Sequence, residues 1–363
     1  MAYSIAQIAQ ALGADAFGAV EMMISGVAEP AMAGAGDLAL AMSPKYAEGL
    51  PLGSARAAML WAGADWRALG LDAAIVAPRP RFAMAGLSAM MDPEMRPASG
   101  IHSSAVVDPT AMIASDVAIG PLSVISAGAS IGAGSIIGAQ VFVGQDATLG
   151  AQAILREGVR IGARVTIGAR FFAQPGAVVG GDGFSFVTPE VSDIEQVRAT
   201  LGAERAARAQ SYARIHSLGS VQIGDDVELG ANACIDRGTV RDTKIGNGVK
   251  FDNLAQIGHN VEIGNDCLIC AQVGVAGSTR IGNNVVLGGQ TGVSDNLLIG
   301  DHVITGGATK VLANVPAGRV MLGYPAMQMQ THIESYKGIR RLPRLFRDVA
   351  ALQKAVFKPG SSD

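Results

Sequence analysis

The sequence is poor in aromatic residues, in charges and in cysteines, and each shortage excludes a class of protein. Aromatic residues make up 5% of the 363 residues, which argues against a core built from large side chains. Charged residues make up 16% and the formal net charge is −3, so we expect no general nucleic-acid-binding surface. The three cysteines, Cys234, Cys267 and Cys270, are too few for a disulfide framework and predict a reducing, cytoplasmic location.

Long apolar runs and metal-ligand patterns are also missing. A glycine or a polar residue interrupts every apolar run before it reaches about 18 residues, the length that spans a membrane. The start, MAYSIAQIAQALGADAFG, lacks the basic region and long apolar core of a signal peptide. Cys267 and Cys270 form a CxxC without a second pair or a histidine cluster, which favours a structural role over a zinc site. We therefore expect no integral membrane segment and no metal.

Glycine, in contrast, is abundant with 47 residues, and it accompanies a hydrophobic residue that recurs at every sixth position. The period runs from Ile101 to Ile167, slips at Ala173, resumes at Ile223 and, after a four-residue offset, runs from Ile245 to Val311. A helix requires a period of 3.6 and an isolated strand a period of 2, so six fits neither. Two inward positions in six predict a short strand and a turn, three of which close a triangular coil of 18 residues. Nearly ten such coils would stack at the β spacing of about 4.8 Å.

Three segments fall outside this repeat. Residues 1–100 lack the period and contain a capping box beginning at Ser4 and an apolar stretch, AAIVAP at 73–78, which together predict a small α/β domain. The repeat domain at 101–320 breaks at about 184–220, where a charged, alanine-rich segment predicts an extruded helical loop. Residues 321–363 predict a basic helical extension interrupted at Pro343. That extension is either a solvated helix face or a dock for an acidic protein partner.

His259 is the histidine whose place in the repeat is most informative. It occupies the third position of its unit, which lies at a corner of the triangle and faces outward. One coil later Gly277 leaves open space and an exposed backbone N–H beside the imidazole, and Asp252 and Asn253 precede His259 by one unit. The alternative is an ordinary surface histidine, such as His302 in a fourth position. We interpret His259 as a candidate general base.

The six-residue repeat resembles that of the hexapeptide-repeat acyltransferases, whose prisms are left-handed parallel β-helices. Within that superfamily, an ordered set of segments over nearly the whole chain is similar to the UDP-3-O-acylglucosamine N-acyltransferases of lipid A biosynthesis. These segments are SPKY (43–46), IDRG (235–238), GNGVKFDN (246–253), QIGHNVEIG (256–264), AGS (276–278) and GYP (323–325).

The resemblance assigns roles to residues of the repeat domain. It implies that His259 is the catalytic base and that the Gly277 N–H faces the acyl carbonyl. It also implies that Asp252 and Asn253 lie near the glucosamine. Asn296 departs from the family pattern, because it replaces a histidine usually found near the substrate phosphates.

In the first domain the resemblance implies a uridine site. Tyr46 matches the aromatic residue that stacks on uracil, and Lys45 lies beside it. Two positions depart from the pattern: Leu40 stands where a second aromatic residue is usual, and Ser43 replaces an asparagine. These departures predict rearranged or weaker uridine binding, with less effect on the chemical step.

The resemblance further implies the reaction and the assembly. A 3-hydroxyacyl chain passes directly from acyl carrier protein to the 2-amino group of UDP-3-O-(3-hydroxyacyl)-glucosamine. The phosphopantetheine arrives on the carrier, so no separate cofactor is expected. The family forms homotrimers with active sites in clefts between prisms, and its C-terminal helices receive the carrier. The alternatives are an O-acyltransferase acting on UDP-N-acetylglucosamine, which usually lacks an N-terminal domain of this size, and a non-catalytic β-solenoid scaffold.

Overall fold

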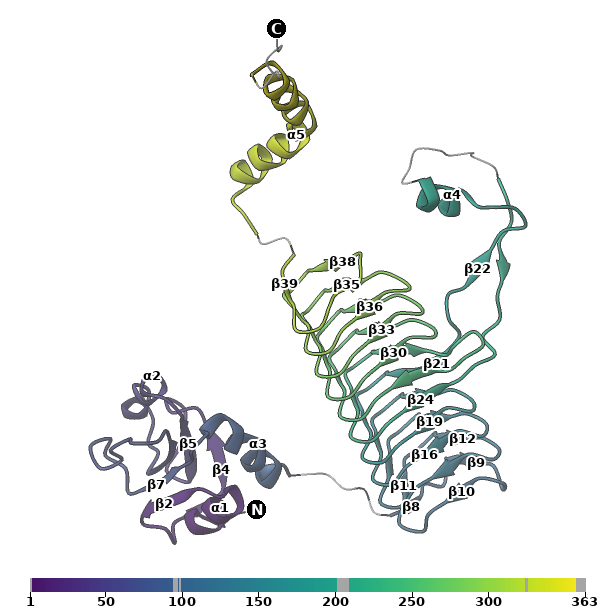
Figure 1. Cartoon of the computed structure of the whole chain (residues 1–363). Helices are drawn as coiled ribbons and strands as arrows, with labels where there is room; N and C mark the ends of the chain where they lie inside the picture. The colour runs from purple at the N-terminus through teal and green to yellow at the C-terminus, as the bar shows by residue number, and fades with distance from the viewer. Residues whose placement is uncertain (1, 94–96, 98, 201–208, 324–325, 357–363) are drawn as a thin grey trace. The chain divides into compact units, whose positions relative to one another are not determined.

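The computed structural model describes residues 2–93, 97, 99–200, 209–323 and 326–356. Part of the GYP segment (Tyr324 and Pro325), the middle of the segment predicted as a helical loop (201–208) and Lys358 of the basic extension lie outside the described residues. The chain divides into two compact units, Met1–Arg96 and Pro97–Asp363. Figure 1 shows the course of each unit.

The first unit is a five-stranded sheet with apolar clusters on its two faces. The strand order is β2 (Asp15–Gly18), β7 (Ala73–Val76), β6 (Ala57–Leu60), β5 (Asp37–Ala41) and β4 (Gly26–Ala28). Only the β2–β7 pair is antiparallel. The other elements are β1 (Tyr3–Ser4), α1 (Ile5–Leu12), β3 (Met23–Ile24), α2 (Pro44–Ala47), the 3₁₀ helix η1 (Leu50–Leu52) and α3 (Pro80–Met91).

Helix α1 begins where the sequence predicts. The Ser4 hydroxyl accepts a hydrogen bond from the Gln7 N–H, and the Gln7 side chain accepts one from the Ser4 N–H, which completes the capping box. Gly13 ends the helix at φ +60°, a left-handed conformation that costs glycine least. Leu38, Met59 and Ile75 present buried side chains to the cluster beneath α1, so the strands and helix share one core.

The second unit is a three-sided prism made of short parallel strands. Face I has eleven strands: β8 (Gly100–Ile101), β11 (Ala118–Ile119), β14 (Ile136–Ile137), β17 (Ile154–Leu155), β20 (Phe172–Ala173), β25 (Glu228–Leu229), β28 (Lys250–Phe251), β31 (Leu268–Ile269), β34 (Val286–Leu287), β37 (Ile304–Thr305) and β39 (Val320–Met321). Face II has ten strands: β9 (Val106–Val107), β12 (Val124–Ile125), β15 (Phe142–Val143), β18 (Arg160–Ile161), β21 (Val178–Gly181), β26 (Cys234–Asp236), β29 (Gln256–Ile257), β32 (Gly274–Val275), β35 (Gly292–Val293) and β38 (Lys310–Val311). Face III has nine strands: β10 (Met112–Ile113), β13 (Ser130–Ile131), β16 (Thr148–Leu149), β19 (Thr166–Ile167), β24 (Val221–Ile223), β27 (Thr243–Ile245), β30 (Glu262–Ile263), β33 (Arg280–Ile281) and β36 (Leu298–Ile299).

Stacking at the repeat distance holds the prism together. Ile257 pairs with Val275, and Val275 pairs with Val293, so identical positions of successive coils lie above one another. The first and fifth residues of a unit point inward: Ile257 is 2% exposed and Val261 is fully buried. The core is therefore a column of small and branched side chains, which explains why so few aromatic residues suffice. The prediction of a mainly β protein with a left-handed parallel β-helix is confirmed.

The corners of the prism have a backbone feature that the sequence does not reveal. The fourth residue of many units adopts a left-handed conformation, for example Leu254 at φ 60°, Asn260 at φ 59° and Ser278 at φ 62°. Such a conformation is uncommon for residues other than glycine. Each of these N–H groups donates to the preceding coil: Leu254 to Ala231 O at 3.0 Å, Ser278 to His259 O at 2.8 Å and Asn260 to Thr243 Oγ1 at 2.9 Å. Stacking hydrogen bonds thus fix the conformation of the corners.

The break in the repeat forms an arm that leaves after β21 and returns at β24. It contains the antiparallel pair β22 (Phe186–Val187) and β23 (Ala213–Arg214) and the helix α4 (Asp193–Thr200). The sequence predicts a helical loop here, and the described part is a hairpin stem that carries one short helix. Each strand of the stem has two residues, too few to give a period-2 pattern in the sequence.

The C-terminal extension is one helix, α5 (Met329–Val356), and every described residue in it is exposed. The predicted interruption at Pro343 is wrong, because the helix continues through this residue. A proline within a helix removes one hydrogen bond, but its φ is compatible with helical geometry, so it need not end the helix. No helix among the described residues has the length and apolar character needed to cross a membrane.

Candidate active site

His259 lies at the corner between faces II and III, two residues after β29, and is half-buried. Its ring packs against two glycines that have no side chain to collide with it. A Cβ built on Gly277 would lie 2.6 Å from Cε1 and 2.7 Å from Nε2 of His259. A Cβ built on Gly183 would lie 2.7 Å from the His259 Cβ. Gly277 therefore contacts the tip of the imidazole and Gly183 contacts its base.

The backbone around the imidazole is held by the ladder between coils. Ser278 N donates to His259 O at 2.8 Å, and Gly258 N donates to Val275 O at 2.9 Å. The Asn260 amide nitrogen donates to Ser278 Oγ at 3.3 Å. Among the described residues the Gly277 N–H donates to no acceptor, so a free backbone donor lies next to the ring. The Gly277 backbone thus lies against the imidazole with its N–H unused by the described residues.

Gly183 belongs to the base of the arm and was not predicted from the sequence. Its N–H donates to Ser217 Oγ at 3.0 Å, which ties the outgoing strand of the arm to the returning one. The signal that points to it is its position in GGDGF (180–184), immediately where the six-residue period breaks. A glycine required by an incoming loop has no periodic partner, so the repeat could not indicate it.

Asp252 and Asn253 lie at a different corner, after β28 and between faces I and II. Asp252 Oδ2 accepts from Ala271 N at 3.1 Å, and Asn253 Oδ1 accepts from Ala231 N at 2.7 Å. Both side chains cap backbone groups of neighbouring coils. Within the described chain no hydrogen bond joins either residue to His259, so one copy of the chain does not bring them together with the imidazole.

Asn296, in contrast, lies at the His259 corner, one coil beyond Gly277. Its N–H donates to Gly277 O at 3.1 Å, and its side-chain amide donates to Asp295 Oδ2 at 3.1 Å. Its φ of 58° places it in the same left-handed position as Asn260 and Ser278. His259, Gly277 and Asn296 therefore occupy successive coils of one corner.

The residues expected at the uridine site lie in the first unit. Leu40 is in β5 and packs partly against the core beneath α1. Ser43 precedes α2 as its N-cap but makes no side-chain capping bond, and Lys45 and Tyr46 are on that one-turn helix. The Tyr46 side chain is 58% exposed, so its ring is available to a ligand.

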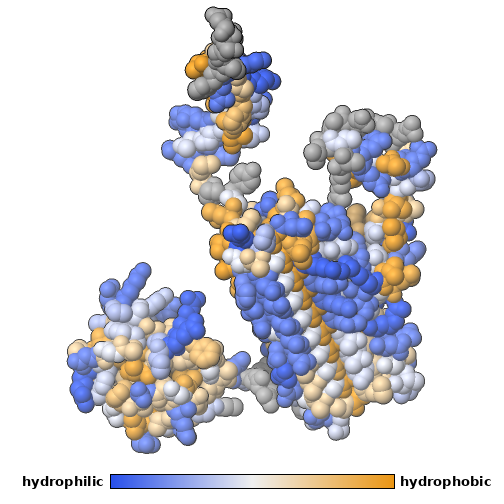
Figure 2. Space-filling view, in the orientation of Figure 1, coloured by the Kyte–Doolittle hydropathy of each residue, from blue (hydrophilic) through white to orange (hydrophobic). Residues whose placement is uncertain are grey.

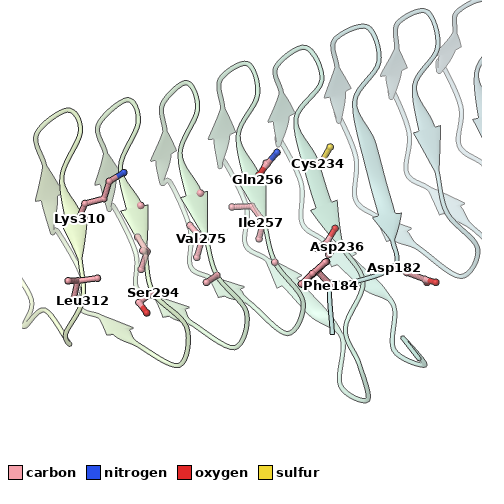
Figure 3. Close-up of a pocket in the computed structure, with 15 residues that line it drawn as sticks. Asp182, Phe184, Cys234, Asp236, Gln256, Ile257, Val275, Ser294, Lys310 and Leu312 are labelled. Atoms are coloured by element: carbon pink, nitrogen blue, oxygen red, sulfur yellow. The ribbon is translucent and has the colours of Figure 1, made fainter. Parts of the chain in front are cut away.

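A groove of about 730 Å³ runs along face II toward the His259 corner. Its floor is made of outward positions within and directly after the strands of face II from β29 to β38. Several of these positions are small: Gly258, Gly274, Ala276, Gly292 and Ser294. Phe184 from the base of the arm and Asp236 from β26 border one end, and Lys310 and Leu312 border the other (Figure 3). Figure 2 shows apolar residues gathered in a band along the prism. The small floor residues leave room for a long, thin apolar ligand.

Two titratable groups at one end of the groove have shifted pKa values. Burial, with the Asp182 carboxylate as a second cause, raises the pKa of Asp236 from 3.8 to about 6. Burial and the nearby Asp236 raise the pKa of the Cys234 thiol. Cys234 is therefore held as a neutral thiol, which is a poor nucleophile. Cys267 has its side chain in the core, with Sγ 3.1 Å from Gly282 O, as its structural interpretation requires.

Comparisons with known proteins show the family to which the chain is similar. The family model described as "Bacterial transferase hexapeptide (six repeats)" matches residues 242–277, and "Hexapeptide repeat of succinyl-transferase" matches 140–169 and 220–250. A UDP-3-O-acylglucosamine N-acyltransferase of Ruegeria pomeroyi is 67% identical over 100% of this chain and 100% of its own length. That of Paracoccus denitrificans is 61% identical over 99% and 98%, and that of Pseudomonas aeruginosa (strain LESB58) is 43% identical over 77% and 73%.

Among solved structures, the UDP-N-acetylglucosamine acyltransferase of Arabidopsis matches with a TM-score of 0.51. It is 20% identical in sequence and covers 73% of this chain and 85% of that chain. This likeness concerns the fold.

Proposed function

The chain belongs to the UDP-3-O-acylglucosamine N-acyltransferase family, and we propose that it makes an amide on a sugar nucleotide during lipid A biosynthesis. The donor is a 3-hydroxyacyl thioester on the phosphopantetheine of acyl carrier protein, and the acceptor is the 2-amino group of UDP-3-O-(3-hydroxyacyl)-glucosamine. The observation that carries the mechanism is the His259 imidazole beside the free Gly277 N–H.

His259 acts as the general base. The attacking amine must lose a proton as its nitrogen bonds to the thioester carbonyl carbon, and imidazole is suited to accept a proton at neutral pH. As the C–N bond forms and the C–S bond breaks, the proton passes through the imidazole to the departing thiolate. The products are an amide and a thiol. Among the described residues that line the groove, Cys234 is the one with a thiol, and this thiol is neutral and therefore a poor nucleophile. The acyl group accordingly passes directly from the thioester to the amine, without an acyl-enzyme.

Gly277 supplies the complementary electrostatic group. As the amine attacks, the carbonyl oxygen gains negative charge, and the free Gly277 N–H is available to donate to it. Loss of one such donor typically costs about 3 kcal/mol of transition-state stabilisation. The proposal is supported by the close approach of the Gly277 backbone to the imidazole, since a Cβ built there would lie 2.7 Å from Nε2.

The groove on face II holds the apolar part of the donor. A 3-hydroxyacyl chain is long and thin, and the floor of glycine, alanine and serine leaves space for its methylenes at about 0.8 kcal/mol for each one buried. Gly258 and Ala276 line the groove and directly precede His259 and Gly277 in the sequence. An acyl chain bound in the groove would therefore end near this catalytic pair. Lys310 and Leu312 would then contact the far end of the acyl group.

Helix α5 is proposed as the dock for acyl carrier protein, an acidic partner. Its described basic residues include Lys337, Arg340, Arg341, Arg344 and Arg347, whereas its carboxylates are Glu334 and Asp348. Of these, the Arg344–Asp348 contact is long, at 3.8 Å, and both side chains are mostly exposed. An exposed excess of positive charge attracts an acidic protein and raises its association rate.

A homotrimer is proposed because one copy of the chain separates residues that the reaction needs together. Asp252 and Asn253 lie at another corner than His259, and a three-fold assembly of prisms can bring that corner of one copy against the His259 corner of the next. The reaction requires no cofactor other than the carrier's phosphopantetheine, and the three free cysteines are consistent with a cytoplasmic location.

One assay tests the reaction directly. The purified chain is supplied with 3-hydroxyacyl acyl carrier protein and either UDP-3-O-(3-hydroxyacyl)-glucosamine or UDP-N-acetylglucosamine, and the products are identified by mass spectrometry. We expect an amide with the amine acceptor. An ester formed on UDP-N-acetylglucosamine would instead indicate the O-acyltransferase reaction, and absence of product with both acceptors would favour a scaffold.

A further inference from the structure

The groove on face II contains a half-buried carboxylate that the proposed mechanism does not use. Asp236 is the last residue of β26 and lines the groove. The strand pairing that sets Ile235 beside Ile257 places Asp236 beside Gly258, the residue before His259. Asp236 therefore lies one coil before the imidazole, inside the groove.

Two rows of outward positions form the floor of the groove. Figure 3 shows Lys310, Gln256 and Cys234 in one row, and Leu312, Ser294 and Asp236 in the other. Gly258 and Ala276 occupy the second row between Asp236 and Ser294, so this stretch has no large side chain. The second row directly borders the catalytic corner, and Asp236 is the carboxylate within it.

No described residue donates a hydrogen bond to the Asp236 side chain. The guanidinium group of the adjacent Arg237 donates to Ala163 O instead. Burial and the carboxylate of Asp182, which is itself exposed, raise the pKa of Asp236 to about 6. At neutral pH the group is therefore mainly ionised, and a half-buried carboxylate without a donor is unfavourable. A ligand that supplies an O–H or N–H would relieve this cost.

The other polar side chains of the groove are weaker acceptors or lie farther from the corner. Ser294 Oγ donates to Asp295 Oδ1 at 3.2 Å, and its oxygen is a neutral acceptor. Lys310, at the far end of the groove, has no acceptor atom on its side chain, and its Nζ donates to Gln290 O at 3.2 Å. Hydrogen bonds to an ionised group are about twice as strong as those between neutral groups. Asp236 is thus the strongest acceptor in the row beside the corner.

The acyl donor has a hydroxyl at a position that this carboxylate can reach. In a 3-hydroxyacyl thioester the hydroxyl oxygen is three bonds from the carbonyl carbon, so a carbonyl held by His259 and Gly277 keeps the hydroxyl close to the corner. Gly258 has no side chain to separate the corner from Asp236. Neighbouring coils are about 4.8 Å apart, a distance that one aspartate side chain and one hydrogen bond span.

We propose that Asp236 accepts a hydrogen bond from the 3-hydroxyl of the donor acyl group and thereby selects hydroxylated chains over plain acyl chains, which lack this hydroxyl. This inference rests on the proposed function. The remaining methylenes follow the small residues of the floor toward Lys310 and Leu312. A plain acyl chain would set a methylene against the carboxylate and leave its charge without a donor. Asp236 therefore disfavours the wrong donor as well as stabilising the right one.

The test measures the binding of 3-hydroxyacyl pantetheine and plain acyl pantetheine of equal chain length to the full-length protein by calorimetry. The unmodified protein should bind the hydroxylated thioester about tenfold or more tightly, because the hydrogen bond is to a charged group. Asp236→Ala should lose this preference, and Asp236→Asn, which keeps a neutral acceptor, should retain part of it. Glu228→Ala removes a carboxylate from face I, outside the groove, and its preference should match that of the unmodified protein.

Asp236→Val provides a gain of binding that a misfolded variant could not produce. Valine removes the charge that a plain acyl chain would have to desolvate, so this variant should bind plain acyl pantetheine several-fold more tightly than the unmodified protein does. The assignment is wrong if Asp236→Ala keeps the hydroxyl preference or weakens both thioesters equally. It is also wrong if Asp236→Val shows no gain, or if Ser294→Ala is the variant that loses the preference.

The acyl-transfer assay is independent of these binding measurements. Amide formation together with a hydroxyl preference indifferent to residue 236 would reject the role of Asp236 alone. A preference that depends on Asp236 without amide formation would reject the proposed reaction alone.

Discussion

An alanine at position 277 would place its methyl carbon 2.7 Å from Nε2 and 2.6 Å from Cε1 of His259. Ordinary contacts of a Cβ begin at 3.4 Å, so the imidazole would have to move by roughly 0.7 Å or more. A displacement of about 1 Å in a catalytic group can reduce the rate about 100-fold, even when binding is preserved. We therefore expect Gly277→Ala to lower kcat by about two orders of magnitude.

The assay is steady-state amide formation with acyl carrier protein as donor, together with thermal unfolding of each variant. Gly289→Ala is the matched control, because a Cβ there meets its nearest neighbour, Ala271 O, at 3.5 Å and lies at a different corner. The control should keep its turnover. A Gly277→Ala protein with kcat within about threefold of the unmodified protein would show that the contact between residue 277 and the imidazole does not govern the chemistry.

Three further predictions concern the groove, its acidic end and the basic helix. Gly292→Leu would fill the floor of the groove next to Lys310, so the variant should prefer shorter acyl donors in a competition between chain lengths, and an unchanged preference would place the chain elsewhere. Because the pKa of Asp236 is raised in the fold, the folded state binds more protons than the unfolded state between pH 3.8 and about 6; its contribution to stability is present at low pH and is lost as the pH rises through this window. Asp236→Asn should therefore flatten the fall in Tm across that range, and a profile identical to the unmodified protein would contradict the shift. Replacement of Arg340, Arg341 and Arg344 by glutamine should raise KM for acyl carrier protein, most strongly at low salt, while KM for the sugar nucleotide stays constant.

The sequence predicts most of the prism because stacking makes its rule periodic. A six-residue period with inward first and fifth positions places Ile257 and Val261 in the core, as observed. The same rule places residue 277 one coil above His259, and the contact between the two follows from the 18-residue separation of stacked positions. A site built from successive coils of one corner can thus be read from spacing alone.

The features that the sequence did not predict depend on non-periodic geometry. Gly183 reaches His259 from the arm, where no repeat fixes the position of the chain. The left-handed conformation of Leu254 is imposed by a hydrogen bond between coils and opposes the residue's local preference. Spacing also could not show that Asp252 serves as a backbone cap at another corner, because the choice between a cap and a catalytic partner depends on which donors lie nearby.

The most direct test of the account is the turnover of His259→Ala with acyl carrier protein as donor. His302→Asn is the control, since His302 is an exposed corner residue at φ 57°, a conformation that asparagine tolerates. We predict that His259→Ala loses turnover by orders of magnitude with unfolding behaviour unchanged, while His302→Asn keeps it. Near-normal turnover in a folded His259→Ala protein would contradict the assignment of the imidazole as the base.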